Sequence, residues 1–212
     1  MTPATNAHPG PLPTRTLPVE RPLTIAITGT HSTGKSTLLA RMAHEMRGRD
    51  LEVATVADLG EQALRLGMPN RHSHTYASTL WIMTRGISAE IETWPHVDVL
   101  LVDRPVPDAL GYYLATMEHR GELPHPTLLG HLRTIAAQHA AHYDLILRTE
   151  IGPGGRADTT SNGHADTRYR HLADQHIARV LADLHIAHRV LASTDHDAAL
   201  AHATEFALVH AP

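Results

Sequence analysis

The sequence predicts an α/β domain, a three-layer sandwich in which about five parallel strands are flanked by helices. From Leu23 onward, short apolar segments alternate with longer segments of helical periodicity, as expected for parallel strands joined by crossover helices. A glycine-rich loop follows the first of these segments and leads directly into a helical pattern. The chain has 212 residues, which suffice for one domain with a substantial core and leave little room for a second.

The first 22 residues differ in composition from the rest of the chain. They are rich in proline and poor in large apolar side chains, so they cannot repay the entropy cost of ordering. We therefore expect residues 1–22 to form a disordered, proline-rich arm and residues 23–212 to form the domain.

Each predicted strand is a short apolar run bounded by turn residues. The run at 97–102 favours a buried strand over a helix because it is short, β-branched and preceded by Pro95. The five predicted strands lie near residues 23–28, 51–57, 97–102, 143–148 and 186–191. Helical patterns lie near residues 37–43, 75–93, 106–119 and 126–141, and from Asp166 onward.

The loop after the first strand carries the most specific motif. Residues 29–36 read Gly-Thr-His-Ser-Thr-Gly-Lys-Ser and fit G-x-x-x-x-G-K-[ST] at every fixed position. In such a phosphate-binding loop (P-loop), glycines let backbone N–H groups converge on a polyphosphate at the positive end of the next helix. A chance glycine turn before a helix is the alternative, which the flanking strand and helix disfavour.

The motif assigns nucleotide contacts to individual residues. The Lys35 ammonium is expected to reach the β- and γ-phosphates, and the Ser36 hydroxyl to ligate a Mg²⁺ ion that bridges them. ATP and Mg²⁺ are therefore the predicted cofactors. The nucleotide-binding residues predicted here are Gly29, His31, Ser32, Thr33, Gly34, Lys35, Ser36 and Thr37.

A second candidate motif, Asp103-Arg104, closes the third predicted strand. In open α/β sheets, ligands bind beyond the carboxyl ends of the strands. There Asp103 is expected to hold Mg²⁺ together with Ser36, and Arg104 to clamp the transferring phosphoryl group. The alternatives are a salt bridge at the strand end or a helix N-cap.

These motifs resemble those of P-loop kinases. The segment that begins Asp103-Arg104-Pro105 is similar to the Asp-Arg segment of thymidylate kinases, although those families usually have an aromatic or small polar residue after the arginine. With the Thr-Gly-x-x-Ser-Thr-Gly-Lys-Ser-Thr pattern of residues 28–37, the chain more closely resembles the AAA-type ATP-binding domain family that contains the ribosylnicotinamide kinase domain of bacterial NAD regulators. The resemblance spans most of residues 23–195 and implies a P-loop NTPase fold and kinase activity.

The resemblance also implies where the phosphoryl acceptor binds. A carboxylate near the end of the second strand contacts the acceptor in these kinases, and Asp58 occupies that position here. Asp58 is the leading candidate for the base that orients the acceptor hydroxyl, with a helix N-cap as the alternative. The predicted acceptor-binding residues are Asp58, Glu61, Arg85, Arg104 and Asp108.

The glycine-rich segment 150–163 follows the fourth strand and is a candidate lid, because loops of this length are usually functional or disordered. Kinases close such segments over the site to exclude water. Beyond it, Arg168 is expected to stabilise charge on the transferring oxygens, and Arg170 to bind the nucleotide. Solvated charges on a helix are the alternative for both.

Composition excludes several other classes of protein. The formal net charge of -4 provides no basic excess for binding nucleic acid, and the absence of cysteine excludes disulfides and thiolate metal sites. The sequence shows neither a signal peptide nor a membrane span, which favours a cytoplasmic enzyme. The 19 histidines include only scattered short-spaced pairs, such as His72/His74, His139/His142 and His185/His188, and this pattern favours compositional bias over a zinc site.

The sequence therefore predicts a phosphotransferase that moves the γ-phosphoryl group of ATP to a hydroxyl of a small, nucleoside-like metabolite. Two alternatives stay open: a nucleoside monophosphate kinase, and an NTPase switch that hydrolyses ATP or GTP. Nucleotide and acceptor are the expected partners, nucleic acid and membrane are not, and a homodimer stays open.

Overall fold

The computed structural model describes residues 21–30, 33–151, 163–191 and 195–212. Nearly all of the predicted arm lies outside these ranges, and so do residues 152–162 of the predicted lid. His31 and Ser32 of the phosphate loop also lie outside them.

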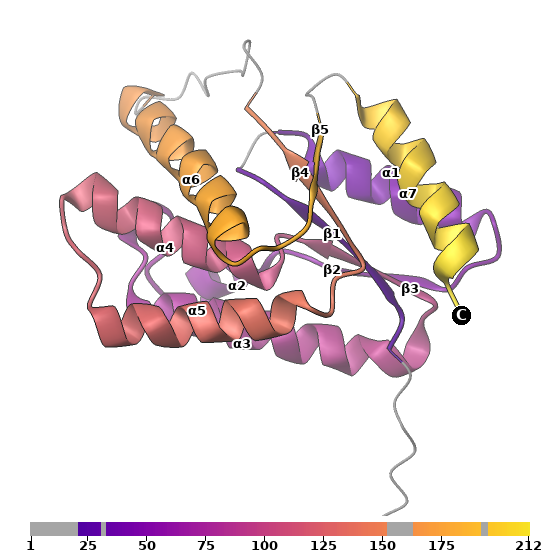
Figure 1. Ribbon diagram of the computed structural model, residues 1–212, viewed down its shortest axis with the longest axis horizontal. Helices are drawn as coiled ribbons and strands as arrows, with labels where there is room; N and C mark the ends of the chain where they lie inside the picture. Colours follow the sequence, from indigo (N-terminus) through magenta and orange to yellow (C-terminus); the bar gives the residue numbers. More distant parts are fainter. Residues whose placement is uncertain (1–20, 31–32, 152–162, 192–194) are drawn as a thin grey trace, which may run out of the picture.

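The described chain contains one five-stranded sheet, in which every paired strand is parallel to its neighbours. The order across the sheet is β2-β3-β1-β4-β5, so β1 lies in the centre (Figure 1). The prediction of a parallel sheet is confirmed. The strand bounds are β1 Leu23–Thr28, β2 Val53–Val56, β3 Val99–Asp103, β4 Leu145–Thr149 and β5 Arg189–Leu191.

Helices cover both faces of this sheet, which makes the predicted three layers (Figure 1). Helices α1 and α7 lie against one face, and α3, α4 and α5 lie against the other. The helix bounds are α1 Lys35–Arg47, α2 Leu59–Arg65, α3 Tyr76–Thr93, α4 Val106–Arg120, α5 Pro126–Ala140, α6 Gly163–Asp183 and α7 His196–His210.

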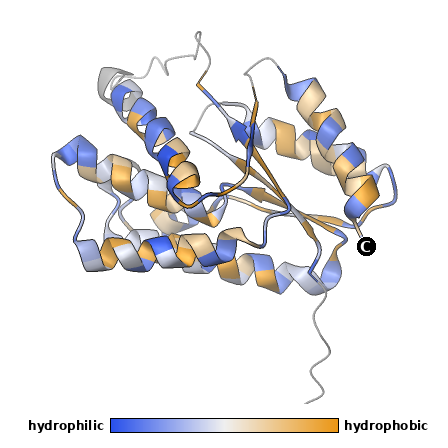
Figure 2. Ribbon diagram, viewed as in Figure 1, coloured by the Kyte–Doolittle hydropathy of each residue, from blue (hydrophilic) through white to orange (hydrophobic). Residues whose placement is uncertain are grey.

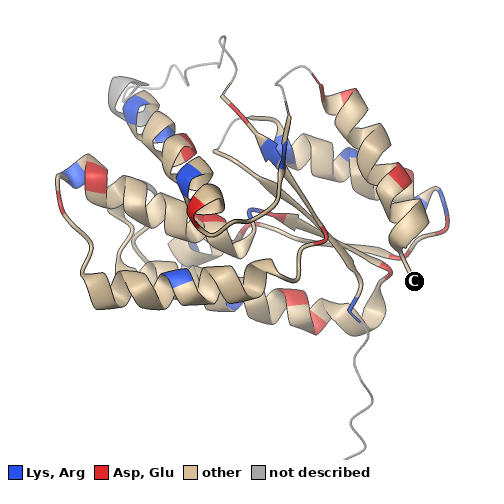
Figure 3. Ribbon diagram, in the orientation of Figure 1, with Lys and Arg blue, Asp and Glu red and all other residues tan. Residues whose placement is uncertain are grey.

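The central strands are apolar on both sides because both faces are covered, as Figure 2 shows by their colour. In β1, Ile25 and Ile27 pack in the cluster beneath α1 and α7, whereas Ala26 packs with Val102 on the opposite face. Charged residues lie mainly on the helices and loops rather than within the strands (Figure 3). In the described ranges, no helix has both the length and the apolar character needed to cross a membrane.

Strand register brings the two sequence motifs together. Ile27 of β1 pairs with Asp103 of β3, and Thr28 pairs with Arg148 of β4. The phosphate loop therefore leaves the sheet beside Asp103, at the carboxyl edge where parallel strands present their loops. The start of α3 is also fixed locally, because Thr75 and Ser78 cap it reciprocally.

The two edge strands are each three residues shorter than predicted. The second strand spans Val53–Val56 instead of 51–57, and the fifth spans Arg189–Leu191 instead of 186–191. Both are edge strands and pair on one side only. In both edge strands, the run of apolar residues in the sequence is longer than the segment that pairs with the neighbouring strand.

Candidate active site

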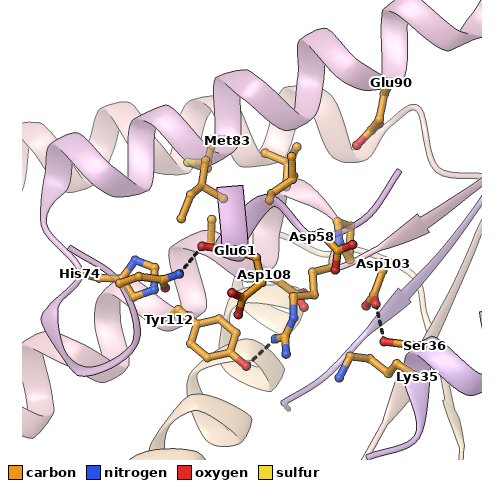
Figure 4. Close-up of a pocket in the computed structure, with 18 of the residues that line it drawn as sticks. Lys35, Ser36, Asp58, Glu61, His74, Met83, Glu90, Asp103, Asp108 and Tyr112 are labelled. Carbon is orange, nitrogen blue, oxygen red and sulfur yellow. Dashed lines mark hydrogen bonds between the residues drawn. The ribbon is translucent and has the colours of Figure 1, made fainter. Parts of the chain in front are cut away.

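A cavity of about 550 Å³ opens at the carboxyl edge of the sheet. Figure 4 shows Lys35 and Ser36 at one end of this cavity and His74 at the other. Helices α1, α2, α3 and α4 contribute to its walls, so distant parts of the sequence meet there. The lining residues are Gly34, Lys35, Ser36, Thr37, Asp58, Leu59, Gly60, Glu61, Asn70, His74, Ile82, Met83, Glu90, Asp103, Arg104, Pro105, Val106, Asp108, Ala109, Tyr112 and Tyr169.

The phosphate loop has the backbone geometry that its glycines permit. Gly29 has φ 127°, and Gly34 has φ 81° at the point where α1 begins. The Lys35 ammonium donates to the Thr30 carbonyl oxygen and, at 3.2 Å, to Thr33 Oγ1. Two residues of the loop, Thr30 and Thr33, therefore accept hydrogen bonds from the lysine of the same loop.

Gly29 also lies against the end of β4. A Cβ atom at this position would lie 2.4 Å from Thr149 Oγ1 and 2.5 Å from the Thr149 carbonyl oxygen. We expect Gly29→Ala to lower the free energy of unfolding by about 2 kcal/mol or more, measured by urea denaturation. Gly130→Ala in α5 is the control: its Cβ would meet nothing within 4 Å, so added helix propensity should stabilise it slightly. Equal stability of Gly29→Ala and wild type would contradict this account of the loop.

Cations converge on the loop. The pKa of Lys35 is lowered to about 7, mainly by burial and also by the positive charges of Arg104 and Arg170, against the opposing effect of Asp103 and Asp108. Arg170 lies on α6 with only 7% of its surface exposed, although it is distant in sequence. Such a set of buried positive charges suits a polyanionic ligand.

Ser36 of the phosphate loop and Asp103 at the end of β3 lie next to each other, as their predicted joint role in holding Mg²⁺ requires. Ser36 Oγ donates to Asp103 Oδ2 at 2.9 Å (Figure 4). The other carboxylate oxygen, Asp103 Oδ1, is buried and has no hydrogen-bond partner in the described structure. A hydroxyl beside a partly unsatisfied carboxylate matches the oxygen ligands that Mg²⁺ prefers, so these two residues fit a magnesium site.

Arg104 has a left-handed backbone, φ 68°, which is uncommon for a residue with a side chain. Its Nη1 atom donates to the Gly29 carbonyl oxygen at 3.2 Å and to the Tyr112 hydroxyl. The guanidinium carbon lies 5.1 Å from the centre of the Tyr112 ring. Arg104 thus connects the phosphate loop to the wall of the cavity, rather than forming the strand-end salt bridge with Asp103.

Asp58 also has a left-handed backbone, φ 61°, where β2 leads into α2. It occupies the N-cap position, but its side chain makes no capping hydrogen bond. The capping alternative is therefore not realised. The exposed carboxylate lines the cavity near Asp103 (Figure 4).

Asp108 is buried and accepts hydrogen bonds from Thr28 Oγ1 and, at 3.4 Å, from the Gly29 amide. Burial raises the pKa of this carboxyl to about 6, although these hydrogen bonds and the charges of Arg104 and Lys35 act to lower it. At pH values between the ordinary pKa of 3.8 and about 6, the Asp108 carboxyl keeps its proton in the native state but loses it in the unfolded chain.

This shift predicts a pH dependence of stability. Raising the pH from about 4 to about 7 should lower the free energy of unfolding of wild type relative to Asp108→Asn, by up to about 3 kcal/mol. The reason is that the native carboxyl loses its proton at a higher pH than the unfolded one. Urea denaturation of both proteins at each pH measures the difference, and a constant difference would contradict the prediction.

A family model described as an AAA domain matches residues 24–199, which is most of the chain. The chain belongs to the AAA domain family. No curated protein sequence matches it.

Two solved structures show the same fold as this AAA domain. The structure of NadR in complex with NR has 16% sequence identity and a TM-score of 0.62, over 92% of this chain and 54% of that one. This chain therefore spans about half the length of that protein. Deoxyadenosine kinase from M. mycoides with bound dATP has 10% identity and a TM-score of 0.61, over 87% of this chain and 98% of that one. The predicted P-loop kinase fold is confirmed.

The structure brings most of the predicted site residues of this AAA domain to one cavity, but not all. Arg85 is not among the lining residues and instead forms an ion pair with Glu92, at 3.6 Å. Arg168 is exposed on α6 and does not line the cavity either. Gly29 and Thr33 belong to the phosphate loop but do not line the cavity; they are hydrogen-bonded to Arg104 and Thr149, respectively.

Sequence reasoning did not identify the far wall of the cavity. His74 is 3% exposed, and burial lowers its pKa to about 4, so the imidazole is neutral near pH 7. Glu90 is also buried and lines the cavity from near the other end of α3; its two oxygens accept from His139 Nε2 at 2.7 Å and from the Tyr143 hydroxyl at 3.0 Å. One signal was available: Glu90 continues the buried positions Met83 and Gly86 on α3, where a carboxylate is unusual.

Among the described residues, no three His, Cys, Asp or Glu side chains form a group able to hold a metal.

Proposed function

We propose that this protein is an ATP-dependent kinase that transfers the γ-phosphoryl group to a hydroxyl of a small, nucleoside-like metabolite. One observation carries the proposal: a single cavity has a phosphate-binding loop at one end and an acidic, partly apolar wall at the other. A reaction that transfers a phosphoryl group from a nucleotide to a second small molecule needs a site that holds both molecules at once.

The donor end would hold ATP through its phosphates. Loop amides and the start of α1 would bind the phosphate oxygens, and Lys35, Arg104 and Arg170 would offset their charge. Ser36 and Asp103 would hold Mg²⁺. When bound, Mg²⁺ neutralises charge that develops on the phosphate oxygens. Phosphoryl transfer needs little more than such positioning and charge stabilisation.

The charge of the acceptor end favours a hydroxyl over a phosphate acceptor. Its walls carry the carboxylates of Asp58, Glu61 and Glu90, and the only basic side chains among the described lining residues are Lys35 and Arg104. A nucleoside monophosphate would need further cations for its own phosphate. Arg85, one of the predicted acceptor-binding cations, lies outside the lining and pairs with Glu92.

The remaining wall of the acceptor end suits a flat, partly apolar group. Ile82, Met83 and Ala109 offer apolar surface, and Tyr112 offers an aromatic ring. Neutral His74 and Asn70 add hydrogen-bonding groups at the same end. A nucleoside-like acceptor combines a ring of this kind with the hydroxyl that receives the phosphoryl group.

Asp58 would orient the acceptor hydroxyl for in-line attack and accept its proton. We expect Asp58→Asn to lower kcat by about 10²-fold while the Kd for Mg-ATP changes little, because the carboxylate acts on the acceptor. Asp50→Asn is the matched control, since Asp50 also has a positive φ and precedes the opposite end of β2. Unchanged kcat would transfer the role of base to Asp103.

Arg168 and the segment 150–163 complete the proposal. Arg168 lies near the start of α6, directly beyond this segment, so closure of the segment would bring Arg168 toward the phosphates. Such closure would exclude water and thereby prevent wasteful hydrolysis of ATP.

The experiment that tests the function is a paired acceptor screen. Purified protein with Mg-ATP is incubated with adenosine, cytidine, uridine or guanosine, or with the corresponding monophosphate, and ADP release is compared with an ATP-only background. We expect one or more nucleosides to raise ADP release and to gain one phosphoryl group by mass. Monophosphates as the only acceptors would favour the nucleotide kinase alternative, and acceptor-independent hydrolysis would favour the NTPase switch.

A further inference from the structure

Two residues that follow β3, Arg104 and Asp108 of α4, bond to the first residue of the phosphate loop. The Gly29 amide donates to Asp108 Oδ2 at 3.4 Å, and the Gly29 carbonyl oxygen accepts from Arg104 Nη1 at 3.2 Å. Asp108 Oδ1 also accepts from the hydroxyl of Thr28, the last residue of β1. Both backbone polar groups of Gly29 are therefore bonded to residues of the segment that follows β3.

These contacts matter because a glycine has no side chain to set its own orientation. The backbone of Gly29 has φ 127°, and a glycine could adopt many other backbone angles at little cost. Its carboxylate partner cannot move easily, since Asp108 is 1% exposed in the first turn of α4. The loop is therefore held at its entrance by a rigid element.

We propose that Asp108 is a positioning residue for the nucleotide: it holds Thr28 and Gly29 so that the loop presents its amides to the phosphates before ATP binds. The proposal rests on the ATP-binding half of the proposed function. It differs from the expectation that Asp108 contacts the acceptor. A loop arranged in advance binds without the entropy cost of ordering it.

The chemistry of the site explains why an aspartate serves this role. Two donors, the Thr28 hydroxyl and the Gly29 amide, point at one short side chain that offers two acceptor oxygens. Asparagine can replace it, because its oxygen can accept from Gly29 while its amide donates to Thr28 Oγ1. Alanine satisfies neither donor.

The test compares Mg-ATP binding to wild type, Asp108→Ala and Asp108→Asn by isothermal titration calorimetry. We expect Asp108→Ala to weaken binding about tenfold or more and Asp108→Asn to stay within about threefold. Asp183→Ala is the control for loss of a carboxylate, because Asp183 forms only a surface pair with Arg133 at 3.1 Å, and it should bind as wild type does. An active acceptor from the paired screen should show an unchanged KM with Asp108→Asn.

A second measurement does not depend on ATP. Hydrogen exchange of the peptide that contains residues 28–35 should be faster in Asp108→Ala than in wild type, without nucleotide. Thr28→Val, which removes one donor, should show an intermediate rate, and Thr28→Ser should restore the wild-type rate. This series keeps the proposal testable even where Asp108→Ala folds poorly.

The outcomes separate this proposal from the proposed function. Wild type that does not bind Mg-ATP would contradict the proposed function, while the exchange series would still decide whether Asp108 holds the loop. Wild-type exchange in both Asp108→Ala and Thr28→Val would overturn the positioning role. Wild-type Mg-ATP affinity in Asp108→Ala, or an altered acceptor KM in Asp108→Asn, would also overturn it.

Discussion

Lys35→Ala is expected to reduce phosphoryl transfer by about 10²- to 10³-fold while leaving the fold intact. Lys35 is the only lysine of the full sequence, in which every other basic residue apart from histidine is an arginine. Its ammonium is buried among the loop residues and lies close enough to Arg104 and Arg170 for their charges to act on it. Removing the ammonium would leave the bound phosphates without one of the positive charges that offset their negative charge.

Lysine at this one position has a physical reason. An ammonium is a compact point charge with three donors, whereas a guanidinium is a broad planar fork. Lys35 Nζ donates to the Thr30 carbonyl oxygen and to Thr33 Oγ1, and the differently shaped guanidinium of an arginine would not place a donor at the same point. We therefore expect Lys35→Arg to lose most of the transfer activity too, although it preserves the charge.

Steady-state turnover with the acceptor found in the paired screen measures this effect, and circular dichroism checks the fold. Arg41→Ala is the control: Arg41 lies on the same helix, but it is exposed and forms a surface ion pair with Asp197 of α7. Full turnover in Lys35→Ala would remove the donor half of the proposed site.

The second large effect is expected for Asp103→Asn, with a loss of about 10²-fold in kcat and a higher Mg²⁺ concentration for half-maximal activity. The carboxylate charge would be lost next to Ser36, while the side chain would keep its size. Because Asp103 Oδ1 has no protein partner in the described structure, the fold should be affected little.

Mg²⁺ titration of turnover at saturating ATP provides the measurement. Asp98→Asn is the matched control, since Asp98 lies just before the opposite end of β3 and accepts from the Glu52 amide at 2.9 Å. It should leave the Mg²⁺ dependence unchanged. The same dependence in Asp103→Asn and wild type would exclude Asp103 from the proposed magnesium site.

Much of the fold could be predicted because its signals are local. The alternation of short apolar runs and helical patterns located all five strands, and the structure confirms their positions within a few residues. The edge strands were predicted too long, because apolar composition does not reveal where pairing stops. The loop motif was predictable for a similar reason, since its fixed positions are contiguous in sequence.

The cavity wall that includes His74 and Glu90 could not be predicted in the same way. His74 lies before α3 and Glu90 near its end, and neither belongs to a sequence motif, although a carboxylate among buried helix positions was a signal for Glu90. The burial that makes His74 neutral depends on neighbours from distant segments. The absence of a capping bond at Asp58 also depends on backbone geometry rather than composition.

By itself, the sequence determined the phosphate loop, the parallel α/β order and the pairing of Ser36 with an aspartate at a strand end, because short-range geometry and strand alternation dictate these features. Only the tertiary structure decided which side chains line the cavity, and that Asp108 bonds to the phosphate loop. The physical reason is that burial, charge and hydrogen bonding at these positions arise from helices far apart in the chain that meet at the carboxyl edge of one sheet.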